Sequence, residues 1–159
     1  MEPGGTTYLT RERLRELEQE LHEMKTKGRA EIAAKIAEAR SHGDLMENAE
    51  YDAAKEEQNL FEMRIKKLEQ ILARARVIDS KDLPNDAVYI LSNVTLENMN
   101  TGERVTYTLV SADEADFERN KLSVTSPVGK ALLKKKVGDH VKIVVPAGTI
   151  EYRILEITR

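Results

Sequence analysis

The sequence predicts an α+β protein, in which a long antiparallel helical hairpin precedes a small antiparallel β-sheet domain. In the first half, apolar residues recur every three or four positions, which is the repeat of packed helices. After residue 86 the period changes to two, and Val, Ile and Thr become frequent, as in strands. The segment Ser-Lys-Asp-Leu-Pro-Asn-Asp at 80–86 interrupts both patterns. We therefore expect two domains, 1–79 and 80–159.

The first predicted helix begins after Thr10, a residue suited to the N-cap position. Its apolar stripe comprises Leu14, Leu17, Leu21, Met24, Gly28, Ile32, Ile36 and Ala39. The steps alternate three and four as far as Gly28, and beyond it the stripe continues with a shifted phase. Such a shift changes locally how two helices wrap around each other. We expect the helix to end near residues 41–43.

The second predicted helix carries a more regular stripe, with steps that alternate three and four throughout. Its members are Tyr51, Ala54, Gln58, Phe61, Ile65, Leu68, Leu72 and Ala75. This is the repeat of a coiled-coil seam. Because the connection to the first helix is short, the two helices must be antiparallel.

The second half predicts a small sheet with one helix packed on it. The expected strands are 88–91, 93–98, 105–110, 140–145 and 149–157, with a turn at 100–102 between the second and third. Ser126 and Pro127 fit the N-cap and first position of a short helix that runs to about Leu133. Strands and helix together form an α+β unit.

The break between the two long helices contains two carboxylates, Asp44 and Glu47. Their spacing is that of a capping box, in which Asp44 would be the N-cap of the second helix and Glu47 its third residue. The same two side chains, at the far end of a hairpin, could instead be presented to a site on another molecule. Both interpretations can hold together, because a cap uses only part of a carboxylate's lone pairs.

Composition excludes several classes of protein. The chain has 159 residues and a net charge of −3, which argues against simple coating of nucleic acid. It has no cysteine, so it can form neither a disulfide nor a thiolate metal site. No apolar run is long enough to span a membrane, and residues 1–7 lack a signal-peptide pattern. We expect a cytoplasmic monomer with no cofactor of its own.

Five sequence features together resemble one known family. They are the Ile-Ala-Glu-Ala-Arg run at 36–40, the acidic motif from Gly43 to Gln58, the Asp-Glu-Ala-Asp-Phe stretch at 113–117, Ser126-Pro127 with the following Ala-Leu-Leu, and the Val-Gly-Asp and Pro-Ala-Gly turns near the end. In this order they resemble the GreA/GreB family of bacterial transcript-cleavage factors, more closely GreA. The resemblance covers nearly the whole chain.

The resemblance implies an N-terminal antiparallel coiled coil and a C-terminal domain of the FK506-binding-protein (FKBP-like) fold. It implies that this domain docks at the rim of the RNA polymerase secondary channel, so that the coiled coil brings its tip to the active centre. There the factor would stimulate the polymerase to cut backtracked nascent RNA. It would be an accessory factor and not itself an enzyme.

The resemblance also implies roles for individual residues. Asp44 and Glu47 would supply oxygens to a Mg ion shared with the polymerase and not held by the free protein. Arg40 and Lys55 would hold RNA phosphates, unless they are ordinary surface charges. Tyr51 would contact the displaced RNA 3′ end, or belong only to the seam. Thr125, Ser126 and Pro127 would dock on the polymerase, although the family often has an acidic or amide residue at position 125.

The sequence is compatible with two other functions. A relative of the same shape could occupy the polymerase channel and inhibit it without stimulating cleavage. The C-terminal fold also suggests a peptidyl-prolyl isomerase, although fold does not fix function. That activity normally needs an aromatic-lined pocket, and this half of the chain offers Tyr89, Tyr107, Phe117 and Tyr152.

Overall fold

The computed structural model describes residues 5–41 and 48–159. It confirms the predicted fold class, a long helical hairpin followed by a β-sheet with a short helix. The chain forms two compact units. The hairpin unit is Glu12–Arg74, and the β unit combines the start of the chain, up to Arg11, with Ala75–Arg159.

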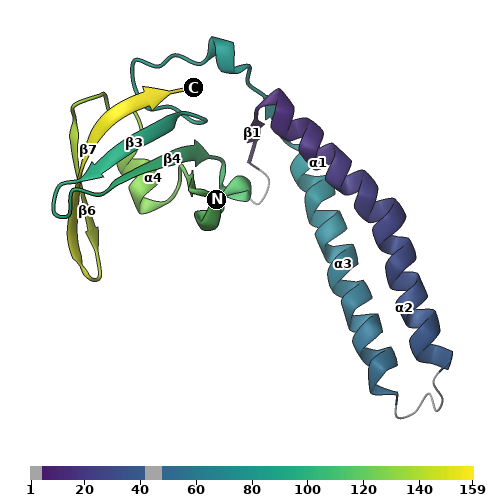
Figure 1. Ribbon diagram of the computed structural model, residues 1–159. Helices are drawn as coiled ribbons and strands as arrows, with labels where there is room; N and C mark the ends of the chain where they lie inside the picture. The colour runs from purple at the N-terminus through teal and green to yellow at the C-terminus, as the bar shows by residue number, and fades with distance from the viewer. Residues whose placement is uncertain (1–4, 42–47) are drawn as a thin grey trace. The chain divides into compact units, whose positions relative to one another are not determined.

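The hairpin unit is built from two antiparallel arms (Figure 1). The first arm comprises α1 (Arg11–Glu23), the π-helical segment η1 (Met24–Gly28) and α2 (Arg29–Ser41), and the second is α3 (Ala49–Ala73). Ion pairs between the arms give their direction: Lys25 bonds to Glu69, Arg29 to Glu62 and Lys35 to Glu57. As the residue number increases along the first arm, the residue number of the partner in α3 decreases, so the two arms run in opposite directions. These pairs are exposed and each stabilises the hairpin little.

Both predicted stripes lie on the inner faces of the arms. Every member of the first stripe is buried or half-buried, with Leu17, Ile32 and Ala39 the most buried. In α3 the buried residues are Ala54, Ile65, Leu68 and Ile71. The prediction was wrong at the end of this stripe. Ile71 is buried there and Leu72 only half-buried, while Ala75 lies beyond the helix, in a strand.

The phase shift predicted at Gly28 coincides with the π-helical segment η1. A π-turn takes in one extra residue per turn and rotates the residues that follow relative to the α-helical repeat. Gly28 itself faces the ring of Phe61 on the other arm, and a Cβ built at Gly28 would lie 2.5 Å from Phe61 Cζ. The absence of a side chain at this position therefore makes room for the aromatic ring.

We expect Gly28→Ala to destabilise the hairpin by about 1 kcal/mol. Alanine favours a helix by about 1 kcal/mol over glycine, but a methyl group forced against the ring costs about 1–3 kcal/mol. In a Phe61→Leu background the clash is relieved, so the same change should be neutral or stabilising. Thermal melting followed by helical circular dichroism measures the double-mutant cycle. Equal effects of Gly28→Ala in both backgrounds would contradict this packing.

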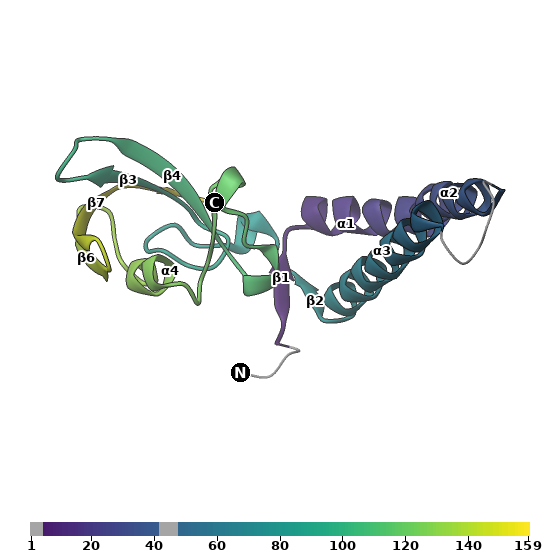
Figure 2. The same ribbon diagram turned by 90° about the horizontal axis from the view of Figure 1, so that it is seen from below.

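The β unit contains a five-stranded sheet in the order β5-β4-β3-β7-β6. Its elements are β3 (Asn93–Asn98), β4 (Arg104–Val110), β5 (Lys121–Ser123), α4 (Pro127–Leu132), β6 (His140–Val145) and β7 (Gly148–Thr158). The sheet curls around α4 (Figures 1 and 2). Leu132 of the helix is fully buried against Leu96, Leu109 and Ile154 of the sheet.

Three features of the β unit differ from the prediction. The segment 88–91 is a turn and not a strand, since Leu91 has φ 72° and Ser92 N–H bonds to Tyr89 O. The sheet is not wholly antiparallel, because β5 pairs with β4 in the parallel sense. Short 3₁₀ segments also occur, η2 (Ser80–Asp82), η3 (Ala112–Glu114) and η4 (Phe117–Arg119).

A second, two-stranded sheet also belongs to the β unit. β1 (Thr7–Leu9) and β2 (Ala75–Val77) pair in parallel, so the hairpin leaves from one strand and returns to the other. β1 is bonded to the segment after β4: Tyr8 N–H donates to Ser111 Oγ at 2.9 Å, and Thr7 Oγ1 to Asp113 Oδ2 at 2.9 Å. Thr7 and Leu9 are almost completely buried.

Candidate functional site

The first candidate site is the end of the hairpin at which α2 stops and α3 begins. Asp44 and Glu47, the two predicted metal-binding carboxylates, lie outside the described residues, between Ser41 and Asn48 in the sequence. Arg40, Tyr51 and Lys55 are described. The contacts of these three residues therefore show which side chains the two arms place at this end of the hairpin.

Asn48 is the N-cap of α3, and its Oδ1 accepts a hydrogen bond from Tyr51 N–H at 3.1 Å. The capping-box interpretation, in which Asp44 is the N-cap of this helix, was therefore wrong. With Asp44 as the N-cap, the helix would begin at residue 45, whereas α3 begins at Ala49, four residues later. Asparagine is as favourable an N-cap residue as aspartate.

Arg40 and Tyr51 are brought together from opposite arms. The guanidinium carbon of Arg40 lies 5.5 Å from the centroid of the Tyr51 ring, a cation–π contact. Tyr51 is half-buried and Arg40 exposed, so the ring belongs to the seam while the charge stays in solvent. Stacking uses the face of the guanidinium and leaves its N–H edge able to bind phosphate or carboxylate oxygens.

Lys55 lies one turn further along α3 and is not part of the Arg40–Tyr51 contact. Its Nζ donates to Gln58 Oε1 at 3.0 Å. Because that partner is a neutral amide, the bond does not cancel the lysine charge. Arg40 and Lys55 thus both place positive charge on exposed surface near this end of the hairpin.

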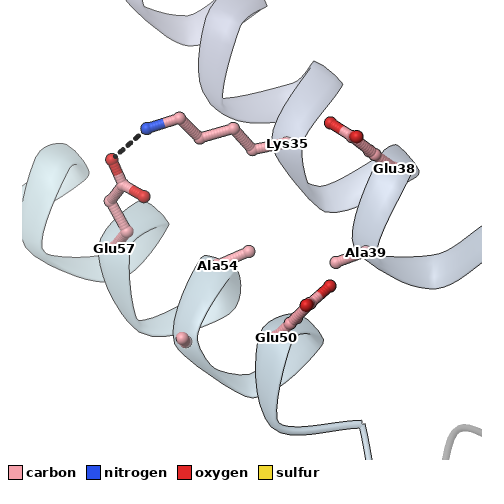
Figure 3. Close-up of a pocket in the computed structure, with 7 residues that line it drawn as sticks. Lys35, Glu38, Ala39, Glu50, Ala54 and Glu57 are labelled. Atoms are coloured by element: carbon pink, nitrogen blue, oxygen red, sulfur yellow. Dashed lines mark hydrogen bonds and ion pairs between the residues drawn. The ribbon is translucent and has the colours of Figure 1, made fainter. Parts of the chain in front are cut away.

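Between the arms, next to this end, is a shallow hollow of about 450 Å³ (Figure 3). It is lined by Lys35, Glu38, Ala39, Glu50, Ala53, Ala54 and Glu57. Its floor is made by Ala39 and Ala54, which are 5 % and 7 % exposed.

The second candidate site is the predicted docking segment, Thr125–Pro127, at the N-terminus of α4. Ser126 is the N-cap: its Oγ accepts from Gly129 N–H at 3.0 Å and donates to Ser123 O at 2.6 Å. Pro127 occupies the first helical turn, as predicted. Thr125 is exposed, its N–H donates to Ser123 Oγ at 3.0 Å, and the two hydroxyls lie 2.6 Å apart. The segment is therefore held rigidly while Thr125 and Pro127 face solvent.

Sequence reasoning missed two residues that shape these sites. Asn48 could have been found as a helix N-cap, because asparagine favours that position. Ser123 gave no signal, because its role depends on the fold of the loop.

The β unit also has a hollow of about 240 Å³, lined by Thr10, Ile78, Ser80, Leu83, Leu91, Asn93, Thr108 and Arg159. This lining includes no aromatic side chain, and Phe117 is 77 % exposed, so this hollow does not support the isomerase alternative.

Comparison with known proteins identifies the class. Residues 7–77 match the family described as transcription elongation factor, N-terminal, and residues 83–159 match the C-terminal family of transcription elongation factor GreA/GreB. The chain is 52 % identical over 151 residues to transcription elongation factor GreA of Chloroherpeton thalassium, covering 95 % of this chain and 96 % of that one. It is 54 % identical to GreA of Chlorobaculum parvum, covering 94 % and 95 %.

A solved structure, that of GreA factor homolog 1 of Thermus thermophilus, is 31 % identical and covers 97 % of this chain and 99 % of that one, with a TM-score of 0.44. The two family matches leave only a few residues uncovered. The chain therefore belongs to the GreA/GreB family of transcription elongation factors.

Across the described residues, no helix combines the length and apolar character needed to cross a membrane.

Proposed function

We propose that this elongation factor binds bacterial RNA polymerase through its secondary channel and stimulates the polymerase's own cleavage of backtracked RNA. Arrested elongation complexes would then resume synthesis. The hairpin would carry Asp44 and Glu47 to the active centre, and the β unit would dock at the channel rim. The factor would be accessory, since the reacting bonds and most of the site belong to the polymerase.

One observation carries the proposal, namely that Asn48 caps α3. The strongest structural explanation for Asp44 and Glu47 was a capping box at the start of this helix, and that explanation no longer applies. Asp44 and Glu47 lie between the two arms in the sequence. In a family of elongation factors, two carboxylates that are not this N-cap support a role as ligands of a metal ion.

The donor set fits magnesium, which prefers carboxylate oxygen and usually keeps several waters. When bound, Mg²⁺ lowers the pKa of an attacking water and neutralises charge that develops on the phosphate. Two carboxylates alone hold it weakly, which fits a site completed by the polymerase. On the described parts of the two arms, Arg40 and Lys55 would attract RNA phosphates, and Tyr51 would support Arg40 from the seam.

The direct test adds the full chain to a defined backtracked elongation complex and follows RNA cleavage. We expect faster cleavage and rescued elongation with the polymerase present, and no cleavage of free RNA by the factor alone. Slower elongation without cleavage would instead establish a channel-binding inhibitor and end the proposal.

The docking part of the proposal makes a separate prediction. Thr125→Arg should raise the half-saturating factor concentration by about 10-fold, because a bulky charge in a packed interface costs roughly 1.4 kcal/mol or more. The maximal cleavage rate should not change. A matched control is Val144→Arg, which places the same side chain at a position that is 80 % exposed on β6, the opposite edge strand of the sheet. Equal effects of the two variants would argue against the docking segment.

A further inference from the structure

The side chain of Asn48 connects the two arms of the hairpin. Its Nδ2 donates to the backbone carbonyl of Ala39 in α2, and its Oδ1 accepts from Tyr51 N–H in α3. The residue is half-buried. One amide group therefore bonds to both helices at the end of the hairpin where α2 stops and α3 begins.

Both bonded groups are of the kind that a helix end leaves without an internal partner. The last four carbonyls of a helix lack an intrahelical donor, and the first N–H groups lack an acceptor. Ala39 lies two residues before the end of α2, and Tyr51 is the third residue of α3. Asn48 thus caps the C-terminus of one helix and the N-terminus of the next.

Few side chains can make both bonds. A side-chain amide carries a donor and an acceptor, whereas an ionised carboxylate only accepts and a serine hydroxyl is shorter. A second contact joins the arms here, because Arg40 of α2 stacks on Tyr51 of α3. Ala39 and Ala54, one from each arm, are both buried and line the hollow of Figure 3. The ends of the arms are therefore fixed relative to each other by side chains on both helices.

We propose that Asn48 is a positioning residue for transcript cleavage, which sets the spacing of the arm ends between which Asp44 and Glu47 lie in the sequence. This inference rests on the proposed function. Catalytic groups lose effectiveness steeply when they are held about 1 Å from their productive positions. Loss of the connection to Ala39 should therefore lower the maximal cleavage rate and leave polymerase affinity unchanged, because the docking segment belongs to the β unit.

The test separates the two bonds of Asn48. Asn48→Asp and Asn48→Ser both keep a good N-cap acceptor for α3 but lose the donor to Ala39. We expect each to reduce the maximal cleavage rate by about 10-fold at an unchanged half-saturating factor concentration, with helix content as in the wild type. The matched control is Asn59→Asp, the same substitution at an exposed position of α3, which should cleave at the wild-type rate.

Two results would overturn the inference. The first is a wild-type maximal rate in both Asn48 variants, and the second is a loss that appears only as a raised half-saturating concentration. In either case the proposed function survives provided that Asp44→Asn, measured in parallel, still loses cleavage. If Asp44→Asn instead cleaves at the wild-type rate, the proposed function fails, and the role given to Asn48 fails with it.

Discussion

Replacing Asp44 with asparagine should lower the rate of stimulated RNA cleavage by about 100-fold or more, and Glu47→Gln should do the same. Removing one preorganised charge from a transition-state site typically costs a factor of about 100–1,000. Each substitution keeps the size of the side chain but replaces a charged carboxylate with a neutral amide, which binds Mg²⁺ more weakly. Because Asn48 caps α3, neither change should unfold that helix.

The measurement is single-turnover cleavage of a defined backtracked complex at saturating factor. Polymerase affinity, taken from competition with labelled wild-type factor, should be unchanged for both variants. Glu50→Gln is a suitable control, because it removes one exposed carboxylate from the first turn of α3 without touching the proposed ligands. Raised Mg²⁺ should partly restore the Asp44 variant, since the remaining ligands bind the ion more weakly. Cleavage at wild-type rates in both variants would refute a role for these carboxylates.

Gly129→Ala should lower the free energy of unfolding of the β unit by about 3 kcal/mol. A Cβ at Gly129 would lie 2.0 Å from the backbone oxygen of Ser123 and 3.0 Å from Ser126 Oγ. Ser123 O accepts hydrogen bonds from both Ser126 Oγ and Ser126 N–H. The methyl group must therefore displace the backbone that holds the docking segment in place.

Denaturant titration measures this loss, with Lys130→Ala as the control. Lys130 is exposed and adjacent to Gly129 in the same helix, so its replacement should change stability by less than about 0.5 kcal/mol. We also expect Gly129→Ala to weaken polymerase binding at temperatures where it remains folded, because Thr125–Pro127 are shifted. An unchanged free energy of unfolding in Gly129→Ala would contradict the prediction, because it would mean that the backbone of Ser123 can move away from α4 at little cost.

The hairpin could be predicted from sequence because burial along a helix is periodic. The stripes from Leu14 to Ala39 and from Tyr51 to Leu68 identified the inner faces, and the phase shift at Gly28 marked the π-helical segment without revealing its nature. Strands joined by a short turn, such as β3 and β4, were also predictable, because alternating apolar residues mark a strand within a few positions of sequence. Ser126 and Pro127 likewise gave the start of α4 directly.

Features that depend on distant partners could not be predicted in this way. β1 and β2 have three residues each, and their pairing joins Thr7 to Ala75, so no local period marks them. The turn at 88–91 contains apolar residues that read as a strand, but Leu91 adopts a left-handed conformation and its N–H bonds to Leu109 O. The connection from Asn48 to Ala39 likewise exists only once the arms are antiparallel. The roles of Asp44 and Glu47 stay predictions.

The attachment of β1 has a consequence for synthesis on the ribosome. Tyr8 and Thr7 bond to Ser111 and Asp113, which are translated more than 100 residues later. At about 5–20 residues per second, this strand waits several seconds for its partners. Both arms of the hairpin are complete by Ala73 and can associate while the nascent chain is still growing. Among the strands of the five-stranded sheet, β7 is translated last, and it lies between β3 and β6. The sheet therefore cannot close before β7 has been synthesised.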